Sequence, residues 1–283
     1  MSIDADTKLF CLLGHPISKS LSPIIHNYSF EENEINARYV AFDVDKNALE
    51  YAVNGIKALN IQGFNVTIPH KVDIIKLLDE IDEEASLLGA VNTVKNVNGK
   101  LTGFNTDGRG FIQALQNNNI DIKDKNITII GAGGAARAIT MTMAKDGARS
   151  IQVANRTVEK AKKIAYEISS KFQNVVTSWT DIQNINTVDM DIVVNCTSVG
   201  MYPDAESFII DPCIFNKNAL ICDIVYKPTL TKFLNVAKQS GYRIMGGIDM
   251  LIYQAILSEQ IWLDKKINSK FFTEKKKDIF NIL

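Results

Sequence analysis

Apolar positions follow two alternating patterns along most of the chain. Short continuous apolar runs predict buried strands, and longer segments in which apolar residues recur every three or four positions predict helices. Because the two kinds of segment alternate, we expect an α/β fold with a mainly parallel sheet and helical crossovers. The expected strands are residues 8–13, 37–44, 63–67, 126–130, 150–154, 175–178, 190–194, 219–225 and 242–245. The expected helices are residues 22–34, 46–58, 105–116, 137–144, 158–171, 230–239 and 250–263, followed by a solvated Lys-rich helix from Asp264.

A β-hairpin is expected between residues 89 and 104. Asn98 and Gly99 separate two strand-like segments there. An Asn-Gly pair favours the tight turn in which both central residues have positive φ. The polar segment 117–125 is then expected to link this part of the chain to the next.

The stretch from Asn126 to Thr157 contains the strongest local motif. A strand is followed directly by the run Gly131-Ala-Gly-Gly-Ala-Ala136, then by a helix and a second strand. This is the order of elements that binds dinucleotides. Gly131 permits the tight turn, Gly133 lets the backbone approach a pyrophosphate, and the helix N-terminus attracts the phosphates. The alternative is a turn between strand and helix with a purely structural role.

The residues after the second strand indicate which dinucleotide is bound. An NAD(H) site usually has an Asp or Glu there to hold the ribose 2′-hydroxyl, whereas this chain has Asn155-Arg156-Thr157 and then Lys160. An arginine can hold a 2′-phosphate with two parallel hydrogen bonds. The sequence therefore predicts NADP(H), with the alternative that Arg156 is a solvated charge. The loop 195–201 is expected to border the same cofactor, because ligands of such sheets bind beyond the carboxyl ends of the strands.

Two serines precede the first expected helix. Ser22 followed by Pro23 indicates a helix start, with Ser22 as the N-cap and the proline at the first helical position. Capping does not explain Ser20. Two hydroxyls at one helix N-terminus can bind a small polyhydroxylated or carboxylate ligand, although Ser22 could serve as a cap alone.

A lysine and an aspartate are candidates for proton transfer. Pro69 is expected to start a helix, which would place Lys71 in the first turn, where the positive end of the helix dipole disfavours a cation. Helix stability therefore does not explain this lysine, and proton transfer is a candidate role. Asp107 opens a later helix and could share a proton with Lys71. The alternatives are an exposed lysine without a role and an aspartate that only caps its helix.

Composition narrows the class of protein. The chain has 283 residues, which suggests two domains, and its net charge of −1 gives no electrostatic argument for a nucleic-acid or membrane partner. The polar N-terminus does not resemble a secretory signal, and no apolar run reaches the roughly 18 residues needed to span a bilayer. We therefore expect a cytoplasmic protein. The four cysteines are expected to be reduced core residues, and the three histidines have no zinc-ligand spacing, so no metal is expected.

Several blocks of sequence occur in one order between Leu9 and Trp262. They are Gly14-His-Pro-Ile-Ser-Lys-Ser-Leu-Ser-Pro-Ile-Ile-His-Asn27, Asn65-Val-Thr-Ile-Pro-His-Lys71, Gly89-Ala-Val-Asn-Thr93, Asn105-Thr-Asp-Gly108, the glycine loop, Asn155-Arg-Thr157 and residues 247–254. In these blocks the sequence resembles the NADP-dependent shikimate dehydrogenase family, over nearly the whole chain. Several blocks in a fixed order are far more specific than the glycine loop alone.

The resemblance implies an α/β fold of two domains with a cleft between them. An N-terminal α/β substrate domain with a mainly parallel sheet would comprise residues 1–107 and 246–283, and a Rossmann-type NADP-binding domain would comprise residues 108–245. The implied activity is the reversible NADPH-dependent reduction of 3-dehydroshikimate to shikimate, in the shikimate pathway to aromatic amino acids. The implied partner is this small-molecule substrate, not nucleic acid or a membrane, and the protein could be a monomer or a homodimer.

The resemblance also implies roles for individual residues. Lys71 matches the proposed proton donor and acceptor of the family, and Asp107 is its catalytic companion. The residues implied for substrate binding are Ser20, Ser22, Thr67, Lys71, Asn92, Asp107, Tyr226 and Gln254. The residues implied for cofactor binding are Gly131, Ala132, Gly133, Gly134, Ala135, Asn155, Arg156, Thr157, Lys160, Ile224, Gly247 and, as a minor position, Glu83.

Three other interpretations remain open at the level of sequence. A quinate/shikimate dehydrogenase using NAD or NADP is similar, although the Asn155-Arg-Thr157 run argues against NAD. A methylenetetrahydrofolate dehydrogenase is disfavoured by the two-serine loop. A ligand sensor or repressor on the same fold would be expected to have lost Lys71 or Asp107, and both are present.

Overall fold

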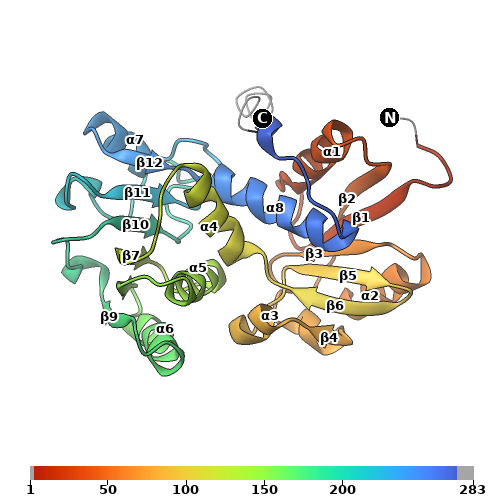
Figure 1. The fold of residues 1–283 in the computed structure, drawn as a ribbon, viewed down its shortest axis with the longest axis horizontal. Helices are drawn as coiled ribbons and strands as arrows, with labels where there is room; N and C mark the ends of the chain where they lie inside the picture. Colours follow the sequence, from red (N-terminus) through yellow and green to blue (C-terminus); the bar gives the residue numbers. More distant parts are fainter. Residues whose placement is uncertain (1–2, 273–283) are drawn as a thin grey trace. The chain divides into compact units, whose positions relative to one another are not determined.

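The computed structural model describes residues 3–272, which form two units (Figure 1). The first unit comprises Met1–Thr106 and Gln254–Leu283, and the second comprises Asp107–Tyr253. Helix α8 (Gly247–Leu263) therefore begins in the second unit and ends in the first. The division expected from the sequence instead assigns the whole of this helix to the first unit.

The first unit is built on a six-stranded sheet with strand order β2-β1-β3-β5-β6-β4. Its strands are β1 (Lys8–Gly14), β2 (Ala37–Asp43), β3 (Gly63–Val66), β4 (Glu80–Ile81), β5 (Thr93–Val97) and β6 (Lys100–Phe104). Its other helices are α1 (Ser22–Glu32), α2 (Leu49–Ala58) and α3 (Glu83–Leu88). β1 pairs in parallel with β2 and β3, and β4 with β6, whereas β5 is antiparallel to β3 and β6.

The hairpin between β5 and β6 has the predicted turn. Asn98 and Gly99 have φ values of 53° and 85°, the left-handed pair that an Asn-Gly turn adopts. The N–H of Gly99 donates to Asn96 Oδ1 at 2.9 Å, which closes the turn. The prediction of a hairpin at this point is therefore confirmed.

Trp262 fixes the end of α8 on the first sheet. Its indole N–H donates to the carbonyl of Val94 in β5 at 2.9 Å. A β-carbon on Gly63 of β3 would lie 2.4 Å from the indole ring, so the ring fits there only because residue 63 is glycine. Trp262 also stacks on Phe10 with ring centroids 4.8 Å apart. The C-terminal turns of α8 are thus held against β3 and β5.

The second unit is built on a six-stranded parallel sheet with order β12-β11-β10-β7-β8-β9. Its strands are β7 (Asn126–Ile130), β8 (Ser150–Ala154), β9 (Val176–Thr180), β10 (Ile192–Asn195), β11 (Leu220–Asp223) and β12 (Arg243–Met245). Its other helices are α4 (Asp107–Asn117), α5 (Gly134–Lys145), α6 (Val158–Lys171) and α7 (Lys232–Gln239). This is the doubly wound order of dinucleotide-binding sheets, in which the chain reverses direction across the sheet between β7 and β10. The expected Rossmann-type architecture is confirmed.

The segment after Thr67 differs from its prediction. No α-helix begins at Pro69, because residues 68–72 form turns and irregular backbone, and a short 3₁₀ helix spans Asp73–Leu77. The argument that Lys71 lies in the unfavourable first turn of an α-helix is therefore wrong. The short elements β4 and α3 were not predicted, since neither is long enough to show a period in its apolar residues.

The expectations for the C-terminal tail and for the cysteines also need correction. Residues 264–269 are not helical and residues 273–283 lie outside the described part of the chain, so only Lys270 and the two residues after it show the helix expected there. Phe271 and Phe272 are buried and contact Tyr28, so this part of the tail is not simply solvated. Cys11, Cys196 and Cys222 are buried free thiols as expected, but Cys213 is exposed.

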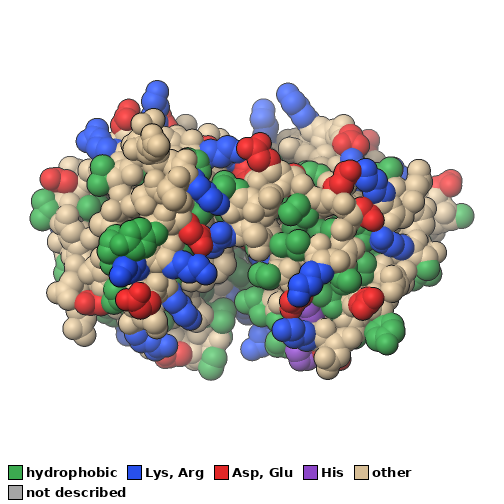
Figure 2. All heavy atoms as spheres, turned by 90° about the horizontal axis from the view of Figure 1, so that it is seen from below, with side chains coloured by type: hydrophobic (Ala, Val, Ile, Leu, Met, Phe, Trp, Pro, Cys, Tyr) green, Lys and Arg blue, Asp and Glu red, His purple; other side chains and the backbone are tan. Residues whose placement is uncertain are grey.

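The surface charge is mixed. On the face shown in Figure 2, Lys and Arg side chains are interspersed with Asp and Glu, in keeping with the net charge of −1. Within residues 3–272, no helix is both long and apolar enough to cross a membrane, and no group of three or more His, Cys, Asp or Glu side chains is placed to hold a metal ion.

Candidate active site

The glycine loop lies at the carboxyl end of β7, beside β10. Gly131 has φ of 116°, and a β-carbon there would lie 3.0 Å from the main chain of Cys196. Both the conformation and the space therefore require glycine. Gly133 is the N-cap of α5, which begins at Gly134, so the free N–H groups of the helix start directly after the loop.

A pocket of about 450 Å³ opens in the second unit around this loop. Seven residues that the sequence predicts for cofactor binding line it together, namely Gly131, Ala132, Gly133, Asn155, Arg156, Thr157 and Lys160. The loop after β10, which was expected to border the cofactor, contributes Cys196, Thr197, Ser198 and Val199. Ile182 and Ile209 complete the lining and have no signal in the sequence, since their position depends on how the loops after β9 and β10 fold.

The charge of this pocket suits a phosphorylated ribose. Arg156 and Lys160 are both among its lining residues, and none of the lining residues is an Asp or Glu. The turn that presents Arg156 is fixed locally, because Asn155 Nδ2 donates to the carbonyl of Thr157 at 2.9 Å. A 2′-phosphate would find two cations here, whereas the carboxylate that usually binds a free 2′-hydroxyl is missing.

The other residues predicted to bind the cofactor lie elsewhere. Gly134 and Ala135 form the start of α5 and are not among the residues that line the pocket. Gly247 begins α8 and packs against the main chain of Ile224, so the structure brings these two predicted residues together. Glu83 is exposed at the start of α3 in the first unit.

A buried polar cluster joins two loops at the carboxyl end of the second sheet. Asp223 Oδ1 accepts the N–H of Val225 at 2.9 Å and the side-chain amide of Asn195 at 3.1 Å, and Asp223 Oδ2 accepts the hydroxyl of Thr231 at 2.7 Å. Asn195 Oδ1 in turn accepts the hydroxyl of Thr197 at 2.7 Å. Burial raises the pKa of Asp223 to about 6, against these hydrogen bonds. The cluster connects the loop that lines the pocket with the segment that contains Ile224 and Tyr226.

Ser20 and Ser22 are connected in the first unit. No side chain caps α1, so the prediction that Ser22 is its N-cap is wrong. Ser20 Oγ instead accepts the N–H of Ser22 at 3.3 Å. Ser22 is buried at the start of α1. The two hydroxyls are thus held in one short segment, as a carboxylate-binding pair requires.

Backbone hydrogen bonds bring Thr67, Lys71 and Asn92 together. The Thr67 N–H donates to the Leu13 carbonyl at 2.9 Å, which fixes the start of the loop on β1. The Lys71 carbonyl accepts the N–H of Val91 at 2.8 Å, so Lys71 lies beside the segment that carries Asn92. Thr67 and Lys71 therefore form one group in the first unit with Asn92, which lies 21 positions after Lys71 in the sequence.

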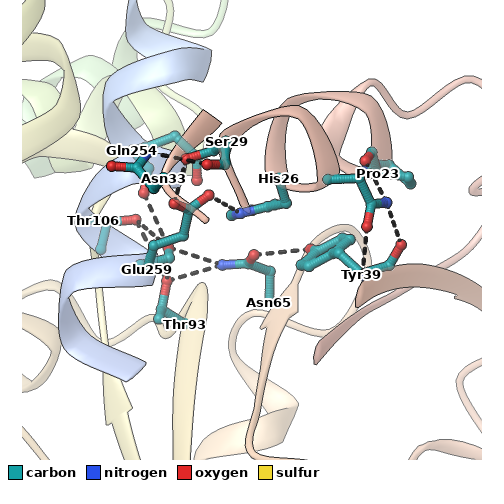
Figure 3. A network of polar contacts seen from close by, with 12 residues as sticks. Pro23, His26, Ser29, Asn33, Tyr39, Asn65, Thr93, Thr106, Gln254 and Glu259 are labelled. Atoms are coloured by element: carbon teal, nitrogen blue, oxygen red, sulfur yellow. Dashed lines mark hydrogen bonds and ion pairs between the residues drawn. The ribbon is translucent and has the colours of Figure 1, made fainter. Parts of the chain in front are cut away.

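A buried network of polar side chains supports this group (Figure 3). Asn65 accepts the hydroxyl of Tyr39 at 2.8 Å and donates to Thr93 Oγ1 and Ser258 Oγ at 3.0 and 3.1 Å. The Asn92 amide bonds the hydroxyls of Thr93 and Thr106, each at 2.9 Å. The hydroxyl of Ser258 donates to the carbonyl of Gln254 at 2.9 Å. Asn92 and Gln254 are therefore connected through Thr93 and Ser258, which were not predicted as part of the site.

The remaining predicted residues belong to the second unit. Asp107 is a buried residue at the start of α4, and Tyr226 follows β11. Burial raises the pKa of the Tyr226 hydroxyl, so this group is protonated and able to donate at neutral pH. Lys71 and Gln254 belong to the first unit. The predicted substrate residues thus come from both units.

Family models cover most of the chain. Residues 12–94 match the model described as shikimate dehydrogenase substrate binding domain, and residues 113–218 match the model described as shikimate / quinate 5-dehydrogenase. A protein of Methanococcus maripaludis named shikimate dehydrogenase (NADP(+)) is 46% identical over 268 residues, which are 93% of this chain and 94% of the relative.

Solved structures share the whole fold. A crystal structure of shikimate dehydrogenase in complex with NADP+ has a TM-score of 0.91 and 43% identity, covering 98% of this chain and 97% of its own. A crystal structure of shikimate 5-dehydrogenase from Listeria monocytogenes, in complex with shikimate and NAD, has a TM-score of 0.90 and 36% identity, covering 97% of this chain and 98% of its own.

Proposed function

Because the chain belongs to the shikimate dehydrogenase family, we propose that it catalyses the reversible NADPH-dependent reduction of 3-dehydroshikimate to shikimate. The observation that carries the cofactor assignment is the pocket in the second unit, where the glycine loop and two cations lie together without a carboxylate. The observation that supports the substrate assignment is the group of hydroxyl, amide and ammonium side chains in the first unit. A small ligand with one carboxylate and several hydroxyls matches that chemistry.

The cofactor residues have distinct tasks in this proposal. The glycine loop and the N-terminus of α5 would hold the pyrophosphate, and Arg156 with Lys160 would hold the 2′-phosphate. Ile224 and Gly247 would form a further contact, where the main chain can approach the ligand because residue 247 has no side chain. NADPH, when bound, supplies the hydride that reduces the ketone.

In this proposal the predicted substrate residues bind the substrate, and one of them, Lys71, also transfers a proton. Ser20 and Ser22 would donate hydrogen bonds to the substrate carboxylate. Lys71 would give a proton to the oxygen that becomes a hydroxyl on reduction, and would take it back in the reverse direction. Asp107 would orient the Lys71 ammonium. The residues that would bond the ring hydroxyls are Thr67, Asn92, Asp107, Tyr226 and Gln254.

A direct spectrophotometric assay tests the substrate and the cofactor together. Purified protein would oxidise shikimate or quinate with NADP+ or NAD+ in four parallel reactions, followed by the absorbance of the reduced cofactor. We expect strong turnover with shikimate and NADP+, and much weaker turnover in the other three. Absence of turnover with shikimate and either cofactor would contradict the proposed function.

A broader quinate/shikimate dehydrogenase is the second candidate. One of the two family models is described as shikimate / quinate 5-dehydrogenase, and one similar structure contains shikimate with NAD. Comparable rates with quinate or with NAD+ would favour this candidate, and would contradict the role proposed for Arg156.

A further inference from the structure

A histidine and a glutamate form a fully buried pair in the first unit (Figure 3). His26 Nδ1 lies 2.7 Å from Glu259 Oε1, and the hydroxyl of Ser29 donates to Glu259 Oε2 at 2.6 Å. All three side chains are 0% exposed. His26 and Ser29 lie on α1 and Glu259 on α8, so the pair joins two helices through residues that are 233 positions apart in sequence.

Stability is a weak explanation for this pair. Burial raises the pKa of Glu259, and the hydrogen bond to His26 offsets this only in part, so burying this carboxyl carries a desolvation cost. Buried pairs of this kind are often replaced by apolar residues without loss of stability. Among the residues that the structure describes, none bonds His26 Nε2, so the bond at Nδ1 sets the orientation of the imidazole.

The imidazole of His26 lies flat against the ring of Tyr39. The ring centroids are 4.1 Å apart and the planes are inclined by 20°. The main chain of Tyr39 is fixed separately, because its N–H donates to Asn27 Oδ1 at 2.9 Å and its carbonyl accepts Asn27 Nδ2 at 2.7 Å. His26 therefore acts on the direction of the Tyr39 ring, and not on the position of its backbone.

The Tyr39 hydroxyl begins a chain of hydrogen bonds that leads to a predicted substrate residue. It donates to Asn65 Oδ1 at 2.8 Å, and Asn65 Nδ2 donates to Thr93 Oγ1 at 3.0 Å. Thr93 Oγ1 in turn donates to Asn92 Oδ1 at 2.9 Å. Asn92 is one of the residues proposed to bond the ring hydroxyls of the substrate. A small rotation of the Tyr39 ring would misalign the first of these bonds, and hydrogen bonds weaken steeply with misalignment.

We infer that the His26–Glu259 pair is a positioning element for the substrate. It holds the Tyr39 ring so that the Tyr39 hydroxyl sets the direction of the Asn65 amide and, through Thr93, that of the Asn92 amide. Neither His26 nor Glu259 touches the substrate in this scheme. The inference rests on the proposed function, because it assigns Asn92 to the ring hydroxyls of the substrate.

Substitution of Glu259 tests the first step. Glu259→Leu removes both carboxylate oxygens, and Glu259→Gln keeps an oxygen that can accept from His26 Nδ1. We expect Glu259→Leu to raise KM for shikimate by about 3- to 10-fold, the range of one hydrogen bond, with KM for NADP+ and kcat within about twofold of wild type. Glu259→Gln is expected to restore most of the shikimate KM.

Asn96→Ala is the matched control. Asn96 is a buried amide of the same unit that donates to the Ile61 carbonyl at 2.8 Å and accepts the N–H of Gly99 at 2.9 Å. Its replacement is expected to lower Tm while leaving KM for shikimate unchanged. If loss of stability alone raised KM for shikimate, this variant would show the same rise and the inference would be overturned.

A double-mutant cycle tests the last step. Tyr39→Phe keeps the ring and removes the hydroxyl, and is informative even if Glu259→Leu does not fold. We expect Tyr39→Phe to raise KM for shikimate by a similar factor, and Glu259→Leu to add almost nothing when it is combined with Tyr39→Phe. Additive effects, a parallel rise in KM for NADP+, or unchanged KM in both single variants would overturn the inference. Wild-type protein that does not bind shikimate would instead contradict the proposed function, and this role with it.

Discussion

A β-carbon on Gly247 would lie 2.2 Å from the carbonyl oxygen of Ile224. The two residues come from different loops of the second unit, one after β11 and the other at the start of α8. Their backbones are in contact because residue 247 has no side chain. Since both are predicted cofactor contacts, this approach is a place where local packing and cofactor binding can be tested by one substitution.

Gly247→Ala should therefore damage both stability and cofactor binding. The added methyl group would meet backbone atoms that cannot move independently, which typically costs about 1–3 kcal/mol as overpacking. We expect a lower Tm and a higher Kd for NADPH, measured by thermal unfolding and by fluorescence titration of the cofactor. Gly55→Ala is the control, because a β-carbon at this position in α2 would have open space around it. That variant is expected to be about 0.5–1 kcal/mol more stable than wild type, with unchanged Kd.

Lys71→Ala should reduce the rate far more than it weakens binding. Removal of a group that transfers a proton in the transition state typically lowers kcat by about 10²–10⁴-fold. We expect kcat for shikimate oxidation to fall by roughly this factor, with KM for shikimate changed much less. Lys76→Ala removes the same charge from an exposed position of the neighbouring 3₁₀ helix and should leave both constants unchanged. A rise in KM with unchanged kcat would make Lys71 a binding residue only.

Arg156→Ala should affect NADP+ and not NAD+. The guanidinium would lose charge-assisted hydrogen bonds to the 2′-phosphate worth roughly 1.5–3 kcal/mol, which corresponds to a rise of about 10- to 100-fold in KM for NADP+. KM for NAD+ is expected to stay constant or fall. Lys163→Ala removes a charge on α6 that does not line the pocket, and should change neither constant. Equal effects of Arg156→Ala on both cofactors would exclude recognition of the 2′-phosphate.

Asp223→Asn should change how stability depends on pH. The pKa of Asp223 is raised from 3.8 to about 6, so its contribution to stability is fully present below pH 3.8 and is lost as the pH rises through 6. The neighbouring thiols of Cys196 and Cys222 stay neutral over this range, because burial raises the pKa of both.

As the pH rises from about 4 to about 7, Asp223→Asn should therefore gain stability relative to wild type, by an amount on the order of 3 kcal/mol. Urea unfolding at several pH values measures this difference. Asn216→Ala, which removes a side chain that does not ionise, is the control and should show a constant difference across the range. A constant difference for Asp223→Asn as well would mean that its carboxyl is not desolvated as the structure indicates.

Predictions from the sequence succeeded where the signal is local. The glycine loop, the Asn98-Gly99 turn and the strands of the second sheet each depend on residues within a few positions of one another. Backbone conformation and apolar periodicity are properties of such short segments, and so they can be recognised without the rest of the chain. The same holds for the Asn155-Arg156-Thr157 run, because it follows directly on a recognisable strand.

Predictions failed where a distant contact replaces a local preference. Pro69 and the residues after it have a plausible helix start, yet the carbonyl of Lys71 bonds the N–H of Val91, and the chain turns instead of forming an α-helix. Ser22 has the composition of a cap, but it is already the first residue of α1, and no side chain caps this helix. The local pattern located the start of α1 but not how its first N–H groups are satisfied.

The sequence by itself determined that this chain is an α/β protein with a dinucleotide-binding unit, and indicated NADP(H) as the cofactor, because those properties rest on motifs of a few adjacent residues. Only the tertiary structure decided which side chains support the predicted ones. Tyr39, Asn65 and Ser258 are ordinary polar residues in the sequence, and they become one network only when β2, β3 and α8 pack together. Likewise, nothing local connects His26 with Glu259. Burial removes water as an alternative partner, so polar groups that meet in the core must bond one another, and which groups meet is set by the fold as a whole.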